Sequence, residues 1–178
     1  MKSLALLAAA GLLLALGAVA SACGGDGGGG LSLEEYFAKL DAAQNEVDRQ
    51  FEEAFQQEEP GPDTSEEDVA AFAREIVQDF STILADAETA IGDLEPAAEA
   101  EDAHNTLVQA IVGARTAVES IADDIPAALP LEELDTLLGA PEVEAATNAV
   151  DEACMELQQI ADDNGIEVDL ECEGEAEG

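Results

Sequence analysis

The sequence contains very few basic residues, with 5 Lys and Arg against 42 Asp and Glu in 178 residues and a formal net charge of −37. Proteins that bind nucleic acid contact its phosphates through clustered Lys and Arg. Beyond Lys2, this chain has only Lys39, Arg49, Arg74 and Arg115. These four are too widely spaced to form a basic patch. The composition therefore excludes nucleic acid as a partner and predicts that anionic partners are repelled.

The chain also lacks tryptophan and contains a single histidine, His104. Glu101 and His104 have the Glu-x-x-His spacing of di-iron bundles, but those sites need two such motifs. No glycine-rich elbow or phosphate loop precedes a predicted helix. We therefore predict no enzyme activity, no cofactor and no metal site. A metal-binding bundle or an enzyme that uses His104 is the weaker alternative.

The first 22 residues have the pattern of a leader. Lys2 is followed by an uncharged stretch of mainly Leu and Ala that reaches Ala22, which predicts a secretory signal peptide over residues 1–22. Since about 20 apolar residues can cross a bilayer, an uncleaved membrane anchor is the alternative. The small residues before Cys23 favour cleavage.

Ala20-Ser21-Ala22-Cys23 resembles the lipobox of bacterial lipoproteins. In those proteins the signal peptide is cut before the cysteine, whose sulfur receives a diacylglycerol and whose amine is often acylated. The resemblance implies a lipid anchor at Cys23, and hence an extracytoplasmic location at the cell membrane or in the cell envelope. Ala20 stands where the lipobox usually has Leu, and the same residues satisfy an ordinary A-x-A cleavage site. A soluble secreted protein is therefore the alternative.

The chain has three cysteines, an odd number for an exported protein. If Cys23 is lipidated, Cys154 and Cys172 remain as a pair. About nine helical residues after Cys154 rise roughly 14 Å, and an extended return of six or seven residues covers roughly 20 Å. The sequence therefore predicts a Cys154–Cys172 disulfide. It also predicts a flexible glycine-rich tether over residues 23–30 and a disordered acidic tail over 173–178.

Apolar residues recur at steps of three and four along most of the body, which predicts amphipathic helices. Prolines and glycines separate these stripes, and Asn164-Gly165 closes the last one before an extended segment. The expected fold is an all-α, up-down bundle of about four main helices in a domain spanning residues 31–172. The main helices run from Leu33 to about Glu59, from Val69 to Leu94, from Ala97 to Ile125 and from Pro141 to about Ile160, with a short helix over 130–138.

Two polar residues interrupt otherwise apolar stripes on the first and third helices, namely Gln44 and His104. These helices run parallel in an up-down bundle. Counted from Leu33 and Ala97, the two side chains fall within about one turn of the same layer, roughly 6 Å. We predict a buried Gln44–His104 contact that fixes the register of the helices.

Three short motifs resemble a loosely defined set of uncharacterised bacterial lipoproteins, although Ala97 stands where similar sequences often repeat the proline. The resemblance implies export, a lipid anchor and a helical body, and it brings no known activity. The motifs are Leu33-Glu34-Glu35-Tyr36-Phe37, Leu94-Glu95-Pro96 with His104, and Cys154-x-x-Leu157 followed by Asn164-Gly165-Ile166 and Val168-Asp169-Leu170-x-Cys172.

The charge suggests a role for this body. After cleavage before Cys23, 42 acidic residues face four basic ones, for a side-chain charge of −38. Such a field attracts cations. We therefore expect an exported, lipid-anchored binding module whose partner is a cationic protein, a cationic peptide or a divalent cation. A structural surface spacer without a ligand is the alternative.

Overall fold

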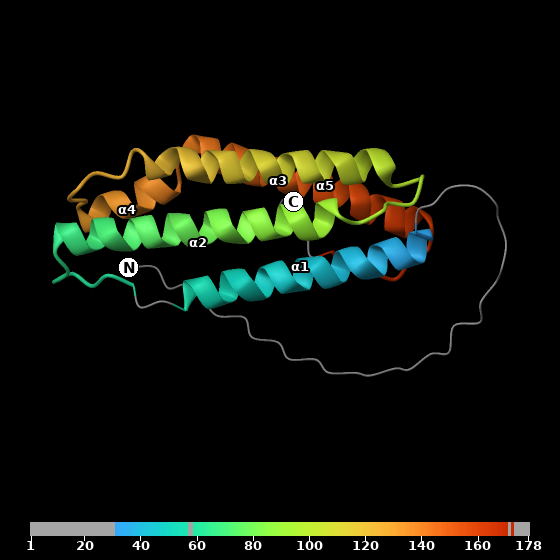
Figure 1. Cartoon of the computed structure of the whole chain (residues 1–178), viewed down its shortest axis with the longest axis horizontal. Helices are drawn as coiled ribbons and strands as arrows, with labels where there is room; N and C mark the ends of the chain where they lie inside the picture. The colour runs from blue at the N-terminus through green and yellow to red at the C-terminus, as the bar shows by residue number, and fades with distance from the viewer. Residues whose placement is uncertain (1–30, 57–58, 171, 173–178) are drawn as a thin grey trace, which may run out of the picture.

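The computed structural model describes residues 31–56, 59–170 and 172 (Figure 1). Over these residues the chain forms helices and no strands, which confirms the predicted all-α class. The predicted signal peptide, lipidation site, tether and acidic tail lie outside the described residues. The helices are α1 (Leu33–Phe55), α2 (Glu66–Gly92), α3 (Glu101–Ala122), α4 (Leu131–Leu138) and α5 (Pro141–Asp163).

Local sequence signals account for several helix ends. Ser32 and Glu35 form a capping box at the start of α1, and the Ser65 hydroxyl accepts a hydrogen bond from the Asp68 amide at the start of α2. At the end of α5, Gly165 has a φ of 67°. This left-handed conformation favours glycine and turns the chain back along the bundle.

Two predicted helix boundaries are wrong by about four residues, and the others agree with the structure to within three residues. Helix α1 ends at Phe55 rather than near Glu59, ahead of Pro60, which disfavours helical geometry in the residue before it. Helix α3 begins at Glu101 because the preceding residues form a separate turn, closed by the Ala100 amide on the Ala97 carbonyl at 2.9 Å. Both alanines are buried, so they extend the apolar stripe without being helical.

The long helices pack in chain order. Helix α1 lies along α2, α2 along α3 and α3 along α5, with α4 against α2 at one end (Figure 1). Within the described residues, α1 and α5 are not packed closely along their lengths, unlike the three pairs of long helices above. The return segment, defined as residues 166–170 with Cys172, instead links them. The Gln44 amide nitrogen on α1 donates to the Leu170 carbonyl at 3.1 Å, and Cys172 forms the predicted disulfide with Cys154 on α5.

The core has two parts. The larger part involves α1, α2, α3, α5 and the return segment and contains the fully buried Tyr36, Phe37, Leu40 and Leu157. The smaller part lies between α2, α3 and α4. Hydrophobic burial in the larger part therefore depends on the return segment as well as on helix packing, because Leu170 is one of its buried members.

Candidate functional site

A groove opens between α1 and α5 beside Cys172, with α2 and α3 forming its floor. Its volume of 370 Å³ lies in the range of small-molecule sites, about 300 to 1,000 Å³. Ile91, Leu107 and Ile111 in the floor are buried, whereas Phe51 and Val150 in the walls are half-buried. Over the described residues the lining is Gln44, Val47, Asp48, Phe51, Phe55, Leu84, Ala87, Ile91, Leu107, Ile111, Val150, Asp151, Cys154 and Cys172.

Gln44 is the uncharged polar residue in this lining. Its amide nitrogen donates to the Leu170 carbonyl at 3.1 Å and lies 3.5 Å from the Cys154 sulfur. Because a carbonyl can only accept, this contact fixes the orientation of the amide group. The Gln44 Oε1 atom is buried and has no hydrogen-bond partner among the described residues. A buried acceptor in this state costs free energy, so a donor that reaches it is favoured.

Two other cavities lie near α4. One of 320 Å³ lies between α1, α2 and α4, and one of 700 Å³ lies between the end of α3 and α4. Over the described residues, Gln44 Oε1 is the buried side-chain oxygen or nitrogen atom that lacks a partner. The residue that carries this atom lines the groove between α1 and α5. We therefore take this groove as the candidate site.

His104 lies in the core, outside this groove. Its Nδ1 atom is 3.2 Å from the Tyr36 hydroxyl, and the two rings meet edge to face with centroids 5.7 Å apart. Burial lowers the pKa of His104 and raises the pKa of Tyr36. Both groups are therefore neutral at neutral pH, and the hydroxyl can satisfy either tautomer of the imidazole.

The predicted contact between Gln44 and His104 is wrong, because the structure gives each residue a different partner. Tyr36 and His104 are each the fourth residue of their helix, so the starts of α1 and α3 lie at the same level. Gln44 lies eight residues beyond Tyr36, about 12 Å along the helix. The prediction placed the start of the third helix at Ala97, a full turn too early.

The Glu101 and His104 pair does not converge on one site. Glu101 is exposed to solvent, whereas His104 is buried and bonded to Tyr36. In the part of the chain that the structure describes, no group of three His, Cys, Asp or Glu side chains is placed to hold a metal ion. This arrangement gives no support to a reaction centred on His104.

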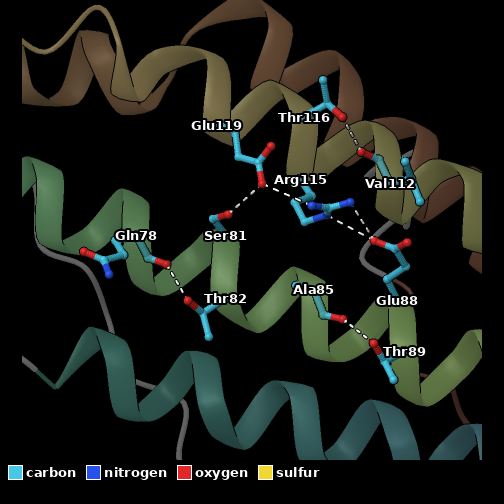
Figure 2. A network of polar contacts seen from close by, with 10 residues as sticks. All are labelled: Gln78, Ser81, Thr82, Ala85, Glu88, Thr89, Val112, Arg115, Thr116 and Glu119. Atoms are coloured by element: carbon cyan, nitrogen blue, oxygen red, sulfur yellow. Dashed lines mark hydrogen bonds and ion pairs between the residues drawn. The ribbon is translucent and has the colours of Figure 1, made fainter.

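Three of the four basic residues in the bundle are engaged by neighbouring groups. Arg115 on α3 bonds to Glu88 at 3.0 Å and to Glu119 at 3.2 Å, and Glu119 also accepts from Ser81 at 3.1 Å (Figure 2). Arg49 is held by Glu46 and Glu53.

The third of these basic residues, Arg74, donates to the Pro126 carbonyl at 2.5 Å. Nearby threonine hydroxyls bond to their own helix backbone, as Thr82 does to Gln78 (Figure 2). The basic side chains are therefore oriented toward groups of this chain, and the surface is dominated by carboxylates.

Sequence reasoning identified Gln44 but missed the groove it lines. Asp48 and Asp151, which supply the charges of the lining, were indistinguishable from the many other acidic residues. The signal that could have found the groove is the length of the return segment. It reaches only as far back as Cys154, about halfway along α5, and so leaves the other half of the α1–α5 side open.

Comparison with known proteins gives no relative. No protein-family model, curated protein or solved structure matches this chain. Within the described residues, no helix is both long and apolar enough to cross a membrane.

Proposed function

We propose that the chain is an exported cell-envelope protein, anchored by lipid at Cys23, whose bundle is a non-enzymatic binding module for a cationic partner. One observation carries the proposal. The chain has a net charge of −37, and Arg49, Arg74 and Arg115 are engaged by carboxylates or carbonyls of the chain itself. The field around the protein is therefore negative, which concentrates cations near its surface and raises their association rates.

The anchor and the charge serve complementary purposes in this proposal. A strongly acidic body is repelled by an anionic membrane. A double or triple acyl anchor holds such a body in place because its apolar chains insert regardless of that repulsion. The lipid then provides attachment, and the acidic surface stays available for a partner in the surrounding medium.

The anchor is tested by the intact mass of the protein extracted from its own membranes. The expected mass is that of the chain from Cys23 to Gly178 plus lipid, with two hydrogens fewer for the disulfide. A Cys23→Ser variant should appear in the medium without lipid. An unmodified chain from Cys23 in the wild type would overturn the lipid anchor and leave a soluble secreted protein.

The partner class is tested by titrating a decalysine peptide into the Cys23→Ser protein recovered from the medium, which carries no lipid and needs no detergent. Attraction between exposed charges is screened within about 10 Å at 0.1 M salt. We therefore expect the Kd, measured by calorimetry, to rise at least about tenfold between roughly 0.05 and 0.5 M NaCl.

Decaglutamate is the matched control and should not bind, and Ca²⁺ should compete with decalysine. A decalysine Kd that does not change with salt concentration would contradict a partner attracted by the negative charge of the protein. Absence of binding at any salt concentration would favour a structural spacer.

A further inference from the structure

The groove between α1 and α5 has an apolar end and a polar end. On α1 the polar residues Gln44 and Asp48 come first, and Phe51 and Phe55 follow about one and two turns after Asp48. Gln44 and Phe55 are eleven residues apart, about 16 Å along the helix. Phe55 is 67% exposed. An elongated ligand with an apolar tail would cover this ring.

Among the described residues, the charged groups of the lining are two carboxylates, Asp48 from α1 and Asp151 from α5, and no Lys, Arg or His of these residues lines the groove. A cationic head group is therefore electrostatically matched to this end, and an anionic one is disfavoured. The partnerless Gln44 Oε1 adds a second requirement, since it can be satisfied only by a hydrogen-bond donor.

From these features we infer that the groove binds a linear amphiphile whose head is a cation bearing N–H donors, such as a primary ammonium, and whose tail is an alkyl chain. The tail would replace water on the Phe51 and Val150 walls, and the head would lie between the two carboxylates and donate to Gln44 Oε1. The inference rests on the proposed function, because it assigns the cationic partner a site and a chemical class.

The first experiment compares head groups on one tail. Decylammonium, decyltrimethylammonium and decanoate are titrated below their critical micelle concentrations into the Cys23→Ser protein recovered from the medium, and binding is measured by calorimetry. Because only a head group with N–H can donate to Gln44 Oε1, decylammonium should bind at least about tenfold more tightly than decyltrimethylammonium, which has no N–H. Decanoate should not bind, and methylammonium, which lacks the tail, should bind far more weakly.

The second experiment changes the groove. Val150→Trp fills the half-buried wall and should weaken decylammonium binding at least about tenfold. Val112→Trp is the matched control, because Val112 is also a half-buried valine but lies on α3 away from the groove. Gln44→Met should remove the preference for decylammonium over decyltrimethylammonium. Thermal melts establish that each variant is folded.

If Val150→Trp does not fold, two double variants that each remove two carboxylate charges test whether decylammonium binds in the groove. Asp48→Asn with Asp151→Asn should weaken decylammonium binding several-fold more than Asp123→Asn with Asp124→Asn, which removes the same charge from outside the groove. Comparing the two pairs distinguishes binding in the groove from general attraction to the negatively charged protein. Salt-sensitive binding of decylammonium that is equal in both pairs would overturn the groove site and leave the proposed function standing. If neither decylammonium nor decalysine binds, both the groove site and the proposed function are overturned.

Discussion

Replacing both Cys154 and Cys172 with alanine is expected to lower the free energy of unfolding by about 3 kcal/mol. The two residues are 18 apart in sequence with Cα atoms 5.6 Å apart, and the disulfide closes a loop that contains the end of α5 and the return segment. In the chain-entropy model a loop of this size restricts the unfolded chain by that amount.

Removing this disulfide should destabilise the protein more than removing a disulfide between two surface loops, because the return segment contributes residues to the core. Leu170 is 3% exposed, its amide donates to the Gln158 side chain at 2.9 Å, and its carbonyl accepts from Gln44. Once the disulfide is gone, fraying of this segment exposes apolar surface on both α1 and α5.

Urea unfolding followed by circular dichroism measures the change. The wild-type protein treated with reductant serves as the control and should unfold at the same urea concentration as the double variant. A midpoint equal to that of the oxidised wild type would show that the return segment holds its place without the disulfide.

His104→Leu is the second substitution with a large expected effect. It leaves the buried Tyr36 hydroxyl without its partner, which costs about 1–3 kcal/mol at neutral pH. The double variant Tyr36→Phe with His104→Leu removes both polar groups and should recover much of that loss, because neither side chain is then an unpaired buried polar group. Equal losses in the single and double variants would contradict this coupling.

The cost of His104→Leu should also depend on pH. Burial lowers the pKa of His104 below its ordinary value of 6.5, so the unfolded chain takes up a proton at this residue more readily than the folded one. Stability that depends on the neutral imidazole is thus fully present above pH 6.5 and is lost as the pH falls toward the folded pKa.

The leucine variant has no imidazole and lacks this loss. The difference in unfolding free energy between wild type and His104→Leu should therefore shrink below pH 6.5. The many carboxylates titrate in both proteins, so their contribution largely cancels in the difference. A pH-independent difference would show that His104 keeps the same pKa after unfolding.

Much of the fold could be predicted from the sequence because its signals are local. The stripe from Val69 to Leu94 predicted α2 to within a few residues, and Asn164-Gly165 predicted the end of α5. The Cys154–Cys172 disulfide followed from the reach of a helix and an extended return, and the structure confirms it. Each of these features depends on residues that are close together in the chain.

The relations between helices could not be predicted in the same way. The partner of His104 depends on the level at which α1 and α3 begin, and the unforeseen turn from Ala97 to Ala100 shifted that level. The candidate groove depends on which side of the bundle the return segment leaves open. Spacing within one stripe carries no information about either, because both are set by tertiary packing and loop geometry.

The return segment also has a consequence for the order of folding. It follows helices α1 to α5 in the chain, and it completes the side of the bundle to which α1 contributes, although Gln44 and Leu170 are 126 residues apart in sequence. During synthesis, α1 can pair with α2 long before its other side is covered. Such distant contacts make closure a late and slow step, so the nascent bundle passes through a stage in which that side of α1 is exposed and open to chaperones or proteases.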